Sequence, residues 1–320
     1  MTPAIETHAL RKVYGPTVAL DALDLRVEPG EVFGFLGPNG AGKTTAVKLL
    51  LGLTRPTAGE GTVLGRPIGD REARGRVGYL PELFRYQAWL TAHEVLRLHA
   101  ALAGLAPGAR PAEIERVLAL AGLADRADER TGGFSKGMQQ RLGLAAALLG
   151  DPALVILDEP TSALDPVGRG DVRAIIREAR ERGSAVLLNS HLLGEVERLC
   201  DRVAVVHHGR VVASGALGDL LGEPAVRLRV TDLPAAATAE DGPLAAFGPV
   251  ALEDGWLAVR PLDADRIPDV VATVVGLGAR VHAVDPARRS LEDVFLDLVR
   301  AGGPQPDEDG PGGHGESRAR

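Results

Sequence analysis

The stretch Gly37-Pro38-Asn39-Gly40-Ala41-Gly42-Lys43-Thr44 decides the fold, because it satisfies the pattern G-x-x-x-x-G-K-[ST] at every fixed position. The apolar run before it, 31–36, predicts a buried strand, and the run that begins at Thr45 predicts a helix. A glycine-rich turn between strand and helix offers backbone N–H groups and the positive end of a helix dipole to a phosphate. The stretch therefore predicts a nucleotide site, with Lys43 reaching the β- and γ-phosphates and the Thr44 hydroxyl binding Mg²⁺.

Composition limits what such a site can serve. The chain has 320 residues, 45% of them hydrophobic, and a net charge of −7, which argues against nucleic acid as the main partner. The single cysteine, Cys200, excludes an intramolecular disulfide and suits a reducing compartment. Because there is neither a run of 18 apolar residues nor a secretory signal, we expect a cytoplasmic protein that reaches a membrane only through a partner.

The order of apolar runs predicts the fold class. Continuous apolar strands are expected at 153–157, 185–189 and 202–207, with helices at 168–182 and 192–199 between them. Strands of this kind, alternating with helices, indicate an α/β fold with a parallel sheet covered on both faces. Short β segments precede the phosphate loop, and residues 91–149 carry helical periodicity.

A break near residues 222–224 divides the chain. Beyond it, four strands are expected, together with helices near 265–275 and 290–300, which describes a small α+β domain with no catalytic motif. The last residues are rich in glycine, proline and acidic side chains. We therefore expect a nucleotide-binding domain at 1–222, an accessory domain at 223–300 and a disordered tail at 301–320.

Two carboxylates follow the apolar strand that ends near residue 157. In phosphate-loop proteins, an acid at the end of a neighbouring parallel strand lies beside the bound Mg²⁺. Asp158 is therefore expected to help hold the metal, and Glu159 to accept a proton from the attacking water. Alone, the pair could simply cap a strand, and the phosphate loop upstream favours the functional interpretation.

Between these two elements lies Phe134-Ser135-Lys136-Gly137-Met138-Gln139-Gln140-Arg141, which leads into an apolar helix. Together with Asp165 after the carboxylates and His191 after the next strand, this arrangement resembles the ATP-binding cassette (ABC) family over roughly residues 4–222. The resemblance implies that Phe134–Met138 is the signature sequence, Asp165 the D-loop aspartate and His191 the switch histidine. It also implies that Tyr14 stacks on adenine and that the catalytic residues are Glu159, His191 and Lys43.

The signature segment makes physical sense as a second phosphate site. Ser135, Gly137 and the helix start that follows offer a hydroxyl, backbone N–H groups and a dipole to an anion, and Ser135 is also a good helix N-cap. In the family the two phosphate sites of one chain lie on opposite surfaces. The resemblance therefore implies a head-to-tail dimer, of two identical or two different ATP-binding subunits, that encloses two ATP molecules.

The same resemblance predicts the partner. The resemblance predicts that the chain is the ATP-hydrolysing subunit of a membrane exporter. It would bind a separately encoded transmembrane permease through the helical region 85–150. The segment Ser290–Leu296 resembles the end of the accessory domain of drug- and lipid-export members, so a drug, antibiotic or lipid is the expected cargo class. The alternative is a soluble ABC-type ATPase that acts on ribosomes or DNA. A phosphate-loop kinase would leave Ser135, Gly137 and His191 unexplained.

Two positions depart from the family pattern. Glu82 stands where the family usually has a glutamine that touches Mg²⁺, and a carboxylate can also ligate this hard cation. Lys136 and Met138 replace the usual glycine and glutamine of the signature. Because Ser135 and Gly137 remain, we expect ATP binding to survive both departures.

Overall fold

The computed structural model describes residues 2–162, 164–222, 225–239, 241–286 and 290–301. Residues 302–320 of the expected tail lie outside these ranges, whereas Ala301 is the last residue of a helix. Across the described ranges, we find no helix with both the length and the apolar character that crossing a membrane demands.

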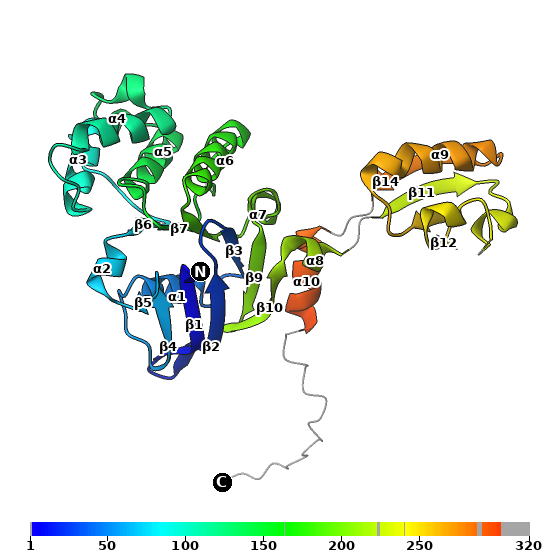
Figure 1. The fold of residues 1–320 in the computed structure, drawn as a ribbon, viewed down its shortest axis with the longest axis horizontal. Helices are drawn as coiled ribbons and strands as arrows, with labels where there is room; N and C mark the ends of the chain where they lie inside the picture. Colours follow the sequence, from blue (N-terminus) through cyan, green and yellow to red (C-terminus); the bar gives the residue numbers. More distant parts are fainter. Residues whose placement is uncertain (1, 163, 223–224, 240, 287–289, 302–320) are drawn as a thin grey trace, which may run out of the picture.

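A six-stranded sheet with the order β10-β9-β3-β8-β7-β6 forms the centre of the larger unit (Figure 1). Its strands are β3 (Val32–Leu36), β6 (Val77–Leu80), β7 (Leu154–Asp158), β8 (Ala185–Asn189), β9 (Arg202–His207) and β10 (Arg210–Ala216). All neighbouring pairs are parallel except β9–β10, which is antiparallel. The strands expected at the centre of the sheet are present, and the two edge strands β6 and β10 had not been predicted.

Both faces of this sheet are buried, which explains the continuous apolar runs. Successive side chains of a strand point to opposite faces. In β3, Val32 and Leu36 belong to one core cluster, whereas Phe33 and Phe35 belong to the other. The expectation of a parallel sheet covered on both sides is therefore confirmed.

Different elements cover the two faces. One face packs on α1 (Lys43–Leu50) and on an antiparallel sheet with the order β2-β1-β4-β5. The strands of that sheet are β1 (Ile5–Tyr14), β2 (Thr17–Val27), β4 (Ala58–Val63) and β5 (Arg66–Pro67). The other face packs on helices. They are α5 (Lys136–Ala147), α6 (Pro166–Glu181), α7 (Leu193–Leu199) and α8 (Leu217–Leu221). In the same core cluster, α3 (Ala92–Leu102) and α4 (Arg110–Leu120) pack on α5.

A smaller unit follows α8. An antiparallel sheet with the order β12-β13-β11-β14 packs on one helix, α9 (Ile267–Gly276), and has its own hydrophobic core (Figure 1). The strands are β11 (Val226–Thr231), β12 (Val250–Glu253), β13 (Trp256–Val259) and β14 (Arg280–Pro286). These elements form the small α+β unit that the sequence predicts.

The last helix differs from expectation in its location. The helix expected at 290–300 is α10 (Leu291–Ala301), and it packs on α7 and α8 of the larger unit. Leu291 and Val294 are buried in the same core cluster as Val196 of α7 and Leu221 of α8. The reason is physical, because an apolar helix face is buried wherever a complementary core is exposed, whatever its position in the sequence. The small sheet unit is thus inserted between two helices of the larger unit.

Candidate functional site

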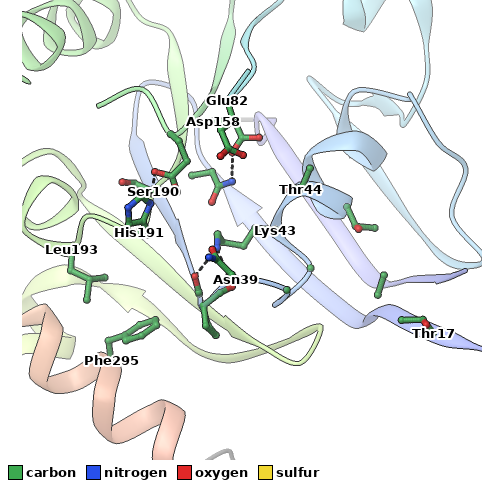
Figure 2. A pocket seen from close by; sticks show the side chains of 18 of the residues that line it. Thr17, Asn39, Lys43, Thr44, Glu82, Asp158, Ser190, His191, Leu193 and Phe295 are labelled. Atoms are coloured by element: carbon green, nitrogen blue, oxygen red, sulfur yellow. Dashed lines mark hydrogen bonds and ion pairs between the residues drawn. The ribbon is translucent and has the colours of Figure 1, made fainter. Parts of the chain in front are cut away.

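The candidate site lies where four parallel strands end. The chain leaves β3 into Gly37, β6 toward Glu82, β7 into Glu159 and β8 into Ser190. Because the carboxyl ends of parallel strands meet at one edge of a sheet, these residues converge. They line a pocket of about 580 Å³ together with the phosphate loop (Figure 2).

Two glycines of the loop are required by close contacts. Gly42 has φ +103°, and a Cβ there would lie 2.4 Å from the backbone oxygen of Ala19. A Cβ on Gly37 would lie 2.3 Å from the backbone oxygen of Val206. Gly42 is also the N-cap of α1, and no side chain caps that helix start. The first N–H groups of α1 therefore stay available to a bound anion.

Lys43 brings a positive charge into this pocket. Its side chain is 8% exposed, and Nζ donates hydrogen bonds to the backbone oxygens of Gly37 at 2.6 Å and Pro38 at 3.2 Å. Burial lowers the pKa of Lys43 below its ordinary value, while nearby carboxylates, Glu159 foremost, act to raise it. A buried ammonium held by two neutral carbonyls is well suited to pair with a phosphate.

Asp158 supplies a buried carboxylate opposite the loop. It is 3% exposed, and Asn189 Nδ2 donates a hydrogen bond to its Oδ1. Burial raises the pKa of Asp158 above its ordinary value, the Asn189 hydrogen bond opposes this, and the charge of Glu82 adds to the rise. The side chains of Glu82 and Asp158 lie together at one side of the pocket (Figure 2).

Glu159 has an unusual backbone. Its φ is +53°, which a residue with a side chain adopts rarely, and its N–H donates to Asn189 O at 2.8 Å. Its Oε2 lies 2.8 Å from Nδ1 of His191, whose side chain is 54% exposed. The turn after β7 thus directs the carboxylate into the pocket, beside the imidazole.

The donor set of the pocket fits a hard cation. Thr44, Glu82 and Asp158 all line it and all carry oxygen. Two further buried oxygens, Glu159 Oε2 and Asn189 Oδ1, lack a hydrogen bond of good geometry. Within the described ranges, no group of three or more His, Cys, Asp or Glu residues could hold a metal unaided. These residues therefore fit Mg²⁺ as it commonly binds, with few carboxylates plus phosphate and water oxygens.

Five predicted site residues do not line this pocket, and one of them, Ala41 of the phosphate loop, is buried in the core. Ser135 is exposed at the N-cap of α5, where its Oγ accepts a hydrogen bond from Met138 N at 3.2 Å, and Gly137 is in the first turn of the same helix. Asp165 caps α6 through a hydrogen bond from Gly168 N at 2.8 Å. Tyr14, at the end of β1, is 45% exposed. The chain by itself thus assembles the phosphate loop, Glu82, Asp158, Glu159 and His191.

Several lining residues had not been assigned roles from the sequence. They are Thr17, Val18, Ala19, Asn189, Ser190, Leu193 and Phe295. The first three are the opening residues of β2, close in sequence to Tyr14, and the next three lie within two residues of His191. Proximity in sequence could therefore have suggested these six. Phe295 comes from α10, more than a hundred residues after His191, so no local signal could have placed it.

This fold and this site define a phosphate-loop nucleotide-binding protein. A family model for "ABC transporter" matches residues 20–162. An uncharacterised ABC transporter ATP-binding protein of Synechocystis is 38% identical over 93% of this chain and 85% of its own length. The Nod factor export ATP-binding protein I of Burkholderia thailandensis is 38% identical over 92% of this chain and 96% of its own length.

Solved structures agree. The ATP-binding subunit of an ABC transporter has a TM-score of 0.63 and 33% identity, over 68% of this chain and 92% of that one. A dimeric ATP-binding cassette in a post-hydrolysis state with ADP and Pi has a TM-score of 0.61 and 25% identity, over 67% of this chain and 99% of that one. The chain belongs to the ATP-binding subunits of the ABC transporter family, and it is an ATPase.

Proposed function

We propose that this chain is the ATP-hydrolysing subunit of an exporter and drives a separately encoded transmembrane permease from the cytoplasmic face of the membrane. One observation carries the proposal. Residues 79–87 connect two hollows, since Glu82 lines the nucleotide pocket whereas Pro81 and Phe84 line a second cavity of about 610 Å³. A change at the nucleotide can therefore reach a partner seated in the second cavity through one short segment.

Each residue of the nucleotide pocket has a proposed role. Lys43 and the loop N–H groups bind the phosphates, and Tyr14 stacks on adenine at the end of the pocket that Thr17 and Val18 form. Glu159 accepts the proton of the attacking water, and His191 beside it holds the terminal phosphate. Thr44, Glu82 and Asp158 hold Mg²⁺, which supplies charge neutralisation on the phosphates.

Two copies of the chain are proposed to share two ATP molecules, head to tail. The signature residues Ser135 and Gly137 lie outside the chain's own pocket. A Cβ at Gly137 would meet nothing closer than 3.7 Å, so packing within the chain does not demand glycine there. A phosphate held on the second copy would explain the glycine, because the absence of a side chain lets the phosphate approach the backbone and the helix start beside it.

The second cavity is the proposed permease site. It lies between β6, α3 and α5, and its walls include Tyr79, Phe84 and Tyr86. On α3, Leu98 is 49% and Leu102 76% exposed at its edge. Exposed apolar side chains around a hollow are typical of a surface that a partner covers.

Export is the proposed direction of transport, and a drug, antibiotic or lipid the proposed cargo class. The name of the relative Nod factor export ATP-binding protein I supports export. A bacitracin transport ATP-binding protein of Bacillus licheniformis, 40% identical over 66% of this chain, supports an antibiotic as cargo. We further propose that residues 1–222 form the nucleotide-binding domain and 223–300 an accessory region whose last helix returns to it.

Affinity purification from native membranes in detergent tests the partner. The tagged full-length chain is expected to retain a multi-span membrane protein, and Leu98→Glu to lose it, because the bound partner would bury the new charge. Val275→Glu, at an apolar position 54% exposed on α9, is the matched control and should retain the partner. Recovery of the chain with ribosomes or chromatin in place of a membrane protein would contradict the proposal.

A further inference from the structure

Helix α10 joins the far end of the chain to the nucleotide pocket. It packs on α7 and α8, and its first N–H, from Leu291, donates to Glu197 Oε2 at 3.3 Å. Leu291 and Val294 are buried in the main core. The helix is therefore an integral part of the larger unit and is held there by both packing and a hydrogen bond across to α7.

One side chain of α10 reaches the pocket itself. Phe295 is half-buried, packs against the main core as Leu193 does, and lines the pocket with Leu193 and His191. Figure 2 shows Leu193 between the imidazole and the phenyl ring. Leu193 is the first residue of α7 and follows His191 by two positions, so the ring of Phe295 lies on the side of the pocket where the chain passes from the imidazole into α7.

The segment that carries His191 needs such support. Helix α7 has no side-chain cap at its N-terminus, and the turn is closed by a hydrogen bond from Leu192 N to Ser190 Oγ at 3.1 Å. The imidazole itself is 54% exposed and approaches Glu159 Oε2 at 2.8 Å. A short, uncapped helix start with an exposed side chain has few contacts to fix it.

We propose that Phe295 is a positioning residue for the ATPase reaction: through Leu193 it fixes the start of α7 and thereby the imidazole of His191 relative to Glu159. A displacement of about 1 Å in a reacting group can cost on the order of 100-fold in rate, so a ring that holds this segment matters for turnover. The inference rests on the proposed role of His191, and it makes α10 part of the catalytic apparatus.

Kinetics of the full-length chain separate this role from others. Phe295→Ala is expected to lower kcat about 10-fold while KM for ATP changes less than about twofold, because positioning acts on the transition state. Phe295→Leu should restore at least half of the activity by refilling the space beside Leu193. Leu296→Ala, at an exposed position of the same helix, is the matched control and should leave kcat and KM unchanged.

A double-mutant cycle with His191→Ala identifies the path. In the His191→Ala background, Phe295→Ala should cost less than about twofold, measured by release of radiolabelled phosphate. An equal loss in both backgrounds would overturn the inference, as would a raised KM with kcat unchanged, which would indicate direct contact with the nucleotide. Failure of Phe295→Leu to rescue would also count against it.

Histidine NMR keeps the inference independent of the role of His191. In ¹⁵N-histidine-labelled protein, the His191 ring signals are assigned by their loss in His191→Ala. Phe295→Ala should shift them and Leu296→Ala should not. If His191→Ala leaves kcat unchanged, the proposed role of His191 fails, while a shift still supports positioning by Phe295. Unshifted His191 signals in folded Phe295→Ala, or in Phe295→Leu should the alanine variant not fold, would refute the positioning contact itself.

Discussion

Helices α1 and α5 both begin beside a glycine that faces a proposed phosphate position, yet they begin in opposite ways. The N-cap of α1 is Gly42, which has no side chain to satisfy the first N–H groups. The N-cap of α5 is Ser135, whose Oγ already accepts a hydrogen bond from Met138 N. The start of α1 is enclosed in the pocket, whereas that of α5 is exposed.

The difference indicates an order of events. The start of α1 lacks partners until an anion arrives, so it is prepared to bind ATP in a single chain. At the start of α5, Ser135 already satisfies one N–H, that of Met138, and the remaining N–H groups meet a phosphate only when a second copy brings one. Substitutions at the two helix starts should therefore separate nucleotide binding from dimer formation.

The largest effect is expected at Glu159, the proposed base, which acts after the starts of α1 and α5 have both contacted phosphate. Glu159→Gln should lower turnover by about 10³-fold, since an amide cannot accept the proton of water, and should leave ATP affinity within a few-fold. Because hydrolysis no longer separates the copies, light scattering at saturating ATP should find a dimer. Glu181→Gln, at an exposed position on α6, is the control and should hydrolyse ATP normally. A monomer at saturating ATP would contradict the proposed role of α5, because its start would then contact no phosphate.

The next effect distinguishes the two helix starts directly. Lys43→Ala should weaken ATP binding by a single chain by about 100-fold, because a buried charge-assisted contact to phosphate is lost. Lys136→Ala, at the first position of α5, should leave this affinity within about twofold, since Lys136 is exposed and outside the pocket. Isothermal titration measures both. Equal losses would mean that both lysines serve the same nucleotide.

The fold and the centre of the site could be predicted because their signals are local. The phosphate loop needs glycine at position 42, where a Cβ would clash with the backbone oxygen of Ala19. The strands are apolar along their whole length because both of their faces are buried. Glu159 and His191 follow such strands directly, so their convergence at one sheet edge could be expected. For these residues, sequence position and spatial position are linked by the topology.

What could not be predicted depends on contacts between distant segments. Strand β10 pairs antiparallel with β9 at the edge of the sheet, and its half-buried residues give a weak periodic signal. The location of α10 was expected in the smaller unit, because apolar periodicity shows which face of a helix is buried and not against what. Phe295 follows from that location, so the sequence alone could not bring it to the pocket.

A smaller effect is expected at the start of α5. Ser135→Ala should cost about 1 kcal/mol of unfolding free energy, as the loss of a helix cap does, and should weaken ATP-driven dimerisation about 10-fold while leaving the affinity of a single chain unchanged. Thr91→Ala is a matched control, because Thr91 caps α3 by the same kind of hydrogen bond, to Glu94 N at 3.1 Å. It should lose similar stability and dimerise normally. Similar dimerisation by both variants would show that Ser135 is a cap and no more.

The smallest effect concerns charge, which also differs between the two starts, since Glu82 and Asp158 face α1. The raised pKa of Asp158 means that the folded state binds its proton more tightly than the unfolded state, whose pKa is near the ordinary 3.8. The resulting stabilisation of the folded state is complete at pH values below the unfolded-state pKa. It is lost as the pH rises through the folded-state pKa.

Glu82→Gln removes one cause of the raised pKa, so the nucleotide-free variant should lose less stability as the pH rises. The difference between the unfolding free energies at about pH 4 and about pH 7, measured with urea, should be smaller in Glu82→Gln than in wild type. Glu60→Gln, at an exposed position of β4 outside the pocket, controls for the loss of one carboxylate and should follow wild type. A steeper pH dependence of the unfolding free energy in Glu82→Gln would contradict this prediction. It would mean that Glu82 stabilises the ionised form of Asp158, which a neighbouring negative charge does not do.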